Sequence, residues 1–277
     1  MVIYGLDFTS SPNKRKPITC AVGSLTRDLL AVEVVEELPS FAAFESFLDR
    51  PGPWRAGLDF PFGQPRRLLV ELHRTGDWAS SVSWLAARGR EAFEELLRSY
   101  RASRPKRDKQ HRRQTDELAG SRSPMMCYGV PVAKMFFEGA PRLLRSNISI
   151  LPVLPRNDSR VGVEPYPKLV AARYAEGRAY KAEDKRRQNA VLTRTRERIV
   201  NGLETHAHRD FWFRLRLASI VREKAIANET GDVLDAVLCA VQAAWSIGQT
   251  SPPDGIPPDC DRLEGWIVDP VLLRSRV

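Results

Sequence analysis

The first 60 residues carry the pattern that most restricts the fold of this chain: three apolar runs, a helical pattern and a fourth apolar run. The runs are short and rich in β-branched residues, and turn-forming clusters separate them; they cover 1–8, 18–22, 29–35 and 54–60. Between the last two, Ser40 is a candidate helix N-cap, followed by phenylalanines at helical spacing. A helix there implies a crossover that makes the fourth strand parallel to an earlier one. The order β-β-β-α-β therefore predicts an α/β protein with a mixed sheet.

The rest of the chain adds one further strand and several helices to this start. Residues 61–159 are basic and show helical patterns where they are regular, and strand-like alternation returns only at 160–164. Helical patterns follow at 182–203, 211–227 and 230–247. We therefore predict a single domain over 1–277 with a five-stranded sheet (β-β-β-α-β-α-β-α), a helical, basic insertion at 61–159 after the fourth strand, and a C-terminal tail at 249–277 that packs on the core.

Composition narrows the class and the location of the protein. With 43% apolar residues among 277, the chain can bury enough surface to offset its conformational entropy, so it is not expected to be disordered. The longest nearly apolar stretch, 233–245, contains Asp235 and Gln242 and is shorter than the roughly 18 to 20 residues of a membrane span. No basic residue precedes the apolar N-terminus, as it would in a signal peptide. We expect a cytoplasmic protein with no membrane partner.

Positive charge is concentrated in the middle of the chain. Residues 61–248 hold 34 basic and 21 acidic side chains, whereas both ends are slightly acidic. Dense basic runs lie at 98–113 and 181–198, and such runs attract phosphate backbones. A solvated helix face is the other explanation. We predict nucleic acid, DNA or RNA, as the partner; the candidate substrate-binding residues are Arg112, Arg113, Lys181 and Arg187, and Asp116 could orient one of the arginines.

Carboxylates stand where the predicted strands end and on the last helix. Asp7 ends the first strand, Asp59 the fourth and Glu164 the fifth, while Asp232 and Asp235 are three apart and so share a helix face. A carboxylate beside an apolar core persists when it is paired or holds a metal. Taken singly, these acids could equally start turns, favour a helix N-terminus or pair with an arginine.

Taken together, the acids predict a metal site. Strand ends and one helix face would bring four or five carboxylates together, and no lysine or arginine lies in the immediate motifs to neutralise them. Hard oxygen ligands select Mg²⁺ or Mn²⁺, and two such ions would activate a water and stabilise the leaving oxygen of a phosphodiester. The candidate catalytic residues are Asp7, Asp59, Glu164 and Asp235; the candidate metal ligands are Asp7, Asp59, Asp232 and Asp235.

The same motifs resemble a known group of proteins. The segments concerned are Gly5-Leu6-Asp7, Gly57-Leu58-Asp59-Phe60-Pro61, Glu164-Pro165-Tyr166-Pro167, Asp232-Val233-Leu234-Asp235-Ala236 and Glu264-Gly265-Trp266-Ile267-Val268-Asp269-Pro270. With the strand order, they are similar to the ribonuclease H-like superfamily and to an uncharacterised prokaryotic domain-of-unknown-function family of predicted RNase H-like nucleases. The paired aspartates of the last helix are also spaced as in RuvC-type resolvases. The resemblance implies that Asp7, Asp59 and Asp235 are core metal ligands, with Glu164 and Asp232 as additional or orienting groups.

Three functions are compatible with these observations. The first is a metal-dependent nuclease, a hydrolase that could act as a homodimer if its substrate is symmetric. The second is a non-catalytic module that binds nucleic acid or protein on the same scaffold. The third is an actin-like-fold phosphotransferase, because residues 5–10 also resemble the phosphate-loop strand of actin-like sugar kinases. Those kinases need a duplicated half and a glycine-rich adenosine site, and neither is visible in this sequence.

Overall fold

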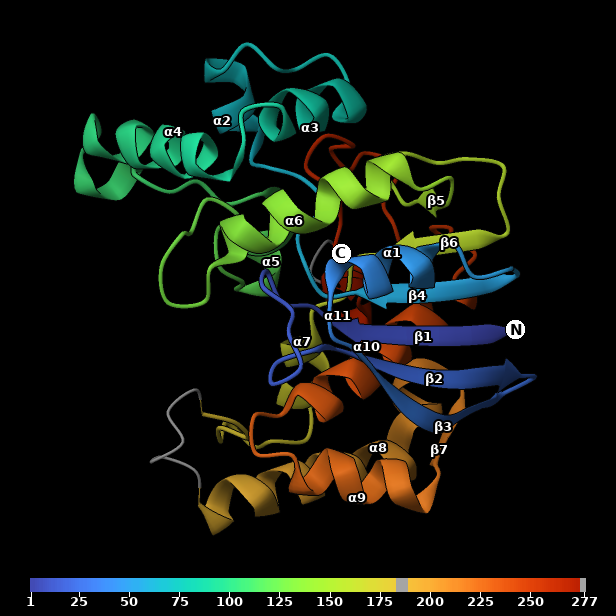
Figure 1. Ribbon diagram of the computed structural model, residues 1–277. Helices are drawn as coiled ribbons and strands as arrows, with labels where there is room; N and C mark the ends of the chain where they lie inside the picture. The colour runs from blue at the N-terminus through green and yellow to red at the C-terminus, as the bar shows by residue number, and fades with distance from the viewer. Residues whose placement is uncertain (183–188, 275–277) are drawn as a thin grey trace.

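Seven strands form one mixed sheet in the order β5-β6-β4-β1-β2-β3-β7 (Figure 1). The computed structural model describes residues 1–182 and 189–274. β1 pairs antiparallel with β2 and β2 with β3, whereas the other four neighbouring pairs are parallel. The strands are β1 (Val2–Asp7), β2 (Ile18–Thr26), β3 (Leu29–Leu38), β4 (Trp54–Leu58), β5 (Ser149–Ile150), β6 (Arg160–Val163) and β7 (Arg214–Leu217).

The predicted α/β class and the opening β-β-β-α-β order are confirmed, but the expected five-stranded sheet is too small. β5 and β7 extend it at its two edges. β7 lies inside the segment 211–227 that we expected to be helical, where the leucines of Arg214–Leu217 are buried and the arginines exposed. Hydrogen bonding to the edge of β3 makes this short alternation a strand, and that pairing is a tertiary effect.

Helices cover both faces of the sheet, and the sheet separates two apolar cores. α1, α2, α3, α4 and α6 contribute to one core, and α10 with α5, α7, α8, α9 and α11 to the other (Figure 1). The helices are α1 (Phe41–Leu48), α2 (Arg66–Glu71), α3 (Trp78–Ala86), α4 (Arg90–Ala102), the short 3₁₀ helix η1 (Lys106–Asp108), α5 (Gln114–Ala119), α6 (Val132–Arg145), α7 (Pro167–Ala172), α8 (Ala190–Phe211), α9 (Ser219–Ala227), α10 (Asp232–Ile247) and α11 (Pro270–Arg274).

Individual boundaries follow from local chemistry. Ser40 caps α1 as predicted, with its Oγ accepting a hydrogen bond from the Ala43 amide at 3.1 Å. The predicted helix 182–203 begins at Ala190 in the structure, where Asn189 is the N-cap. The segment 61–159 contains α2 to α6, η1 and the short β5. None of the helices in residues 1–182 and 189–274 has the length and apolar character needed to cross a membrane.

Strand β1 divides its side chains between the two cores. Tyr4 and Leu6 belong to the core under α1, while Ile3 belongs to the core under α10. Because side chains alternate along a strand, Gly5 and Asp7 face α10 together with Ile3. The first predicted acid therefore lies at the end of β1 on the side of the sheet that α10 covers.

Candidate active site

Two glycines let α10 lie directly against β1 and β4. A Cβ atom on Gly5 would stand 2.1 Å from the carbonyl oxygen of Ala236, and one on Gly57 would stand 2.5 Å from that of Cys239. In β1, and one residue past the end of β4, an aspartate follows two positions after the glycine and so shares the glycine's face. The register pairs Leu6 with Leu58, so the two aspartates follow the same edge of the sheet.

Asp235 meets these two aspartates from the first turn of α10. Its side chain is fully buried, and the Tyr180 hydroxyl donates a hydrogen bond to its Oδ1 at 2.7 Å. Burial raises the pKa of Asp7 well above its usual range, and the neighbouring charges of Asp235, Asp232 and Asp59 raise it further. Burial and the charge of Asp235 likewise raise the pKa of Asp59 to about 8. These aspartates therefore form a cluster, called the acid cluster below: Asp7, Asp59, Asp232 and Asp235.

Lys181 supplies a cation to the acid cluster. Its Nζ forms an ion pair with Oδ2 of Asp235, while its side chain is still 43% exposed. Burial alone lowers the pKa of Lys181, but attraction to Asp235, Asp7 and Asp59 raises it above its usual value. The sequence motifs around the acids contain no such base, and the lysine that partly neutralises them lies 54 positions before Asp235.

The chain around Lys181 is held in place by a buried arginine. Arg196, which is 1% exposed, donates from Nη1 to the carbonyl oxygen of Tyr180 at 2.8 Å and from Nε to that of Ile226 at 2.7 Å. Gly231 precedes α10 with a φ of 80°, and a Cβ there would stand 3.0 Å from Cδ of Lys181. One member of the second basic run is thus structural.

The acid cluster as it stands does not close around a metal ion. Across residues 1–182 and 189–274, no three His, Cys, Asp or Glu side chains are grouped so that they could hold one. The donor chemistry nevertheless suits Mg²⁺ or Mn²⁺, because all the acids offer hard carboxylate oxygens. Burial, and after it the charge of Asp235, raises the pKa of both Asp7 and Asp59, and Lys181 offsets only part of this effect.

Glu164 lies in a different environment, beside the buried guanidinium of Arg113. Its Oε1 accepts from Nη2 of Arg113 at 2.5 Å, and its Oε2 accepts from Nη1 at 2.8 Å and from the Phe62 amide at 2.9 Å. Asp116 also binds Arg113: its carboxylate oxygens accept hydrogen bonds from Nε at 2.8 Å and from Nη2 at 2.9 Å. Both oxygens of Glu164 are therefore already bonded, although its charge still reaches Asp59.

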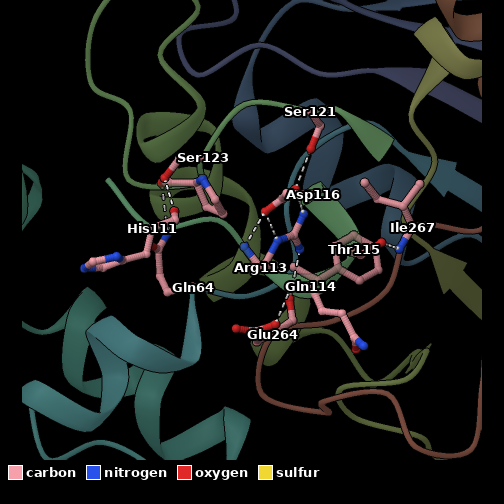
Figure 2. A network of polar contacts seen from close by, with 12 residues as sticks. Gln64, His111, Arg113, Gln114, Thr115, Asp116, Ser121, Ser123, Glu264 and Ile267 are labelled. Carbon is pink, nitrogen blue, oxygen red and sulfur yellow. Dashed lines mark hydrogen bonds and ion pairs between the residues drawn. The ribbon is translucent and has the colours of Figure 1, made fainter. Parts of the chain in front are cut away.

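This arginine network ties the insertion to the C-terminal tail. Figure 2 shows Arg113 between Asp116 and Glu264, with Ser121 beyond Asp116. The carbonyl oxygen of Glu264 accepts from Nη1 of Arg113 at 2.9 Å, and its carboxylate accepts from the Gln114 amide at 2.9 Å. The Ile267 amide donates to Oγ1 of Thr115 at 2.9 Å. A segment 150 residues away in sequence thereby fixes the start of α5.

The predicted site residues thus fall into two groups. Asp7, Asp59, Asp232 and Asp235 act on one another electrostatically, with Lys181 among them, whereas Glu164 and Arg113 form the adjacent buried network. Arg112 is exposed beside that network, and Arg187 lies outside the described residues. Sequence reasoning missed Tyr180, whose only signal was its position next to a predicted lysine, and the roles of Glu264 and Arg196.

The sheet and the acid cluster define an α/β protein with a partly buried carboxylate site that includes one lysine. The family model described as "Protein of unknown function (DUF429)" matches residues 5–257, which is most of the chain and includes the whole acid cluster. The chain belongs to this family. Searches of curated proteins and of solved structures returned no match.

Proposed function

We propose that this protein is a metal-dependent nuclease that hydrolyses phosphodiester bonds of DNA or RNA. The observation that carries the proposal is the convergence of Asp7, Asp59 and Asp235, from β1, β4 and α10, into one electrostatically strained cluster. The order β-β-β-α-β along the chain, with acids at the ends of β1 and β4 and on a late helix, is the arrangement that the ribonuclease H-like resemblance implies. Asp7 and Asp59 are only partly buried, so solvent reaches the site.

Each residue has a defined part in the proposal. Asp7, Asp59 and Asp235 would hold Mg²⁺ or Mn²⁺, with Asp232 beside them, and the bound ions would supply an activated water and stabilise the leaving oxygen. Tyr180 keeps Asp235 oriented through its hydroxyl. Lys181 balances the cluster in the free protein and, once released from Asp235, can contact a phosphate with its ammonium group. Glu164 is a positioning residue, because its oxygens hold Arg113.

Hydrolysis of labelled single-stranded, duplex and branched DNA and RNA with Mg²⁺ or Mn²⁺ tests this proposal. We expect Asp7→Asn and Asp235→Asn to lose cleavage while the exposed Asp28→Asn variant, whose residue pairs with Arg214 at the opposite edge of the sheet, keeps it. Mn²⁺ should also stabilise the wild type against urea, by about 2.7 kcal/mol at one hundred times its Kd, and should not stabilise Asp7→Asn. Equal cleavage by Asp7→Asn and the wild type would contradict the proposal.

The ion pair of Lys181 with Asp235 also favours a second candidate, a non-catalytic binding module. A permanent lysine would neutralise the acids as a structural element and leave the exposed basic residues to bind nucleic acid. This candidate predicts salt-sensitive binding that divalent ions do not change, and no cleavage of any substrate. Cleavage that appears with Mn²⁺ and disappears in Asp235→Asn would reject it.

A further inference from the structure

A hollow of about 560 Å³ lies on the basic insertion, outside the acid cluster. It gathers four arginines from separate segments and a single carboxylate, Glu117; we call it the arginine hollow, and its arginines are Arg67 of α2, Arg107 of η1, and Arg112 and Arg122 of the loops on either side of α5. Arg67 pairs with Asp108 at 2.8 Å. The other three are exposed and form no ion pair with any residue of 1–182 or 189–274.

The wall of the arginine hollow also offers an unused hydrogen-bond donor. Gln110 lines the hollow, and its buried Nε2 has no hydrogen-bond partner among the residues that the structure describes. Arg107, Arg112 and Arg122 add three guanidinium groups that form no ion pair with the described residues. Three such groups in one hollow suit a phosphate, which offers several acceptor oxygens and negative charge.

The arginine hollow is built on a rigid part of the fold. Arg112 adjoins Arg113, whose guanidinium is fixed by Asp116 and Glu164, and the Ser123 hydroxyl is hydrogen-bonded to the carbonyl oxygen of His111 (Figure 2). Guanidinium groups on anchored backbone lose less entropy when they bind phosphate than those on a loose loop. The backbone beside Arg112 and Arg122 is therefore tied to the rest of the fold by hydrogen bonds.

The arginine hollow also lies close to the acid cluster. The register pairs Gly57 of β4 with Val163 of β6. Glu164, which binds Arg113, and Asp59 therefore follow the neighbouring ends of these two strands. The hydroxyl of Tyr166 is within electrostatic reach of both regions: burial and the charge of Asp59 raise its pKa to about 12, and the charge of Arg122 acts in the opposite direction. Both charged regions thus act on the same side chain.

We infer that the arginine hollow binds phosphate groups of the substrate nucleic acid. These phosphates lie on the same strand as the phosphodiester at the acid cluster, a short distance along it. This inference rests on the proposed function and adds the subsite that would hold the substrate. Arg112 adjoins Arg113 of the network and the charge of Arg122 acts on Tyr166, so we assign these two arginines to the phosphates closest to the reacting one. Arg107 and Arg67 extend the contact along the strand.

Binding of labelled single-stranded and duplex oligonucleotides, measured by fluorescence anisotropy between 0.05 and about 0.4 M salt, tests the inference. For Arg112→Gln/Arg122→Gln we expect the slope of log K against log salt to fall by about 1.4 for single strands or about 1.8 for duplex, and affinity near 0.15 M salt to fall about tenfold. Arg216→Gln is the matched control, because Arg216 is exposed on the edge strand β7. Equal melting temperatures establish that both variants fold.

The outcomes separate this inference from the proposed function. If Arg112→Gln/Arg122→Gln binds with the affinity and slope of the wild type, or if Arg216→Gln is weakened equally, the arginine hollow is not the subsite. If pyrophosphate binds to the wild type and not to Arg112→Gln/Arg122→Gln, while no oligonucleotide binds to either, the ligand is a small phosphate compound. The assignment to a nucleic-acid strand is then wrong. Asp7→Asn should bind normally; if it also cleaves normally, the nuclease proposal fails while the subsite stands.

Discussion

At the scale of single residues, the acid cluster makes the stability of the protein depend on pH. The pKa of Asp59 is about 8 in the fold and about 3.9 in an unfolded chain. Between these values the unfolded state is ionised and the folded state keeps its proton, so unfolding releases a proton and stability falls as pH rises. The slope from one such group approaches about 1.4 kcal/mol per pH unit.

Asp59→Asn removes this titration, and we expect it to be more stable than the wild type at pH 8 and similar to it near pH 4. Urea denaturation at several pH values with a chelator present measures the difference. Asp28→Asn should keep the wild-type slope between pH 5 and 8, because the pKa of Asp28 is lowered by its hydrogen bond with Arg214 and it is already ionised in this range. Parallel curves for Asp59→Asn and the wild type would contradict the raised pKa.

Arg113 gives a second prediction at this scale. Its side chain is 1% exposed, and those of its partners Asp116 and Glu164 are 2% and 3% exposed. Arg113→Met leaves both carboxylates buried without a cation, so we expect a loss of about 3–5 kcal/mol in the free energy of unfolding.

Urea denaturation measures this loss, and adding Glu164→Gln should restore part of it, since one uncompensated charge disappears. Arg214→Gln, which breaks an exposed pair with Asp28, should cost less than about 1 kcal/mol. A loss for Arg113→Met no larger than that of Arg214→Gln would show that the network is not important for stability.

At the scale of elements, the contact between α10 and the sheet depends on the absence of a side chain at Gly5. Gly5→Ala would place a Cβ 2.1 Å from the carbonyl oxygen of Ala236 and 2.2 Å from the amide nitrogen of Ala240, both backbone atoms. We expect a loss of about 1–3 kcal/mol or more, because the helix has to move away from β1. The same movement separates Asp235 from Asp7, so cation affinity should fall as well.

Two glycines serve as controls for this prediction. A Cβ on Gly76 meets nothing within 4 Å, and one on Gly162, in strand β6, makes only an ordinary contact of 3.4 Å with Leu58. Urea denaturation should show that Gly76→Ala changes the free energy of unfolding by no more than about 0.5 kcal/mol. For Gly162→Ala we also expect only a small change in the free energy of unfolding. Gly5→Ala with the stability of Gly76→Ala would contradict the close packing of α10.

The sequence predicted those elements whose pattern is local, and missed those that depend on a partner. β1 to β4, α1 and α10 each carry an apolar pattern within their own residues and were found, and so was the position of Asp7 and Asp59 at strand ends. β5 has two residues and β7 four, and each is a strand only because an edge of the sheet pairs with it. The Lys181 contact with Asp235 spans 54 residues, and no local spacing encodes such a pair.

At the scale of the whole molecule, the C-terminal segment completes both the core and the arginine network. The family match ends at residue 257, yet the residues beyond it include large buried side chains: Leu263, Trp266, Ile267, Val268 and Leu272. Asp269 is fully buried and accepts from Nε2 of Gln242 at 2.8 Å. The tail is therefore part of the fold. Its removal would expose apolar surface and would take away hydrogen-bond acceptors of Gln242 and Arg113.

Truncation after Pro257 tests this role. Burying each large apolar side chain contributes about 1.5–3 kcal/mol, and four or five of them together match the 5–15 kcal/mol that stabilises a typical domain. We therefore expect the truncated chain to be unfolded, without the cooperative melting and dispersed amide NMR signals of the full chain. The point variant Trp266→Ala should fold but lose about 3–5 kcal/mol, whereas Ile220→Ala, at a residue that is 54% exposed, should change stability by less than about 0.5 kcal/mol. A truncated chain that melts like the full-length protein would mean that residues 258–277 only cover a core that is already complete without them.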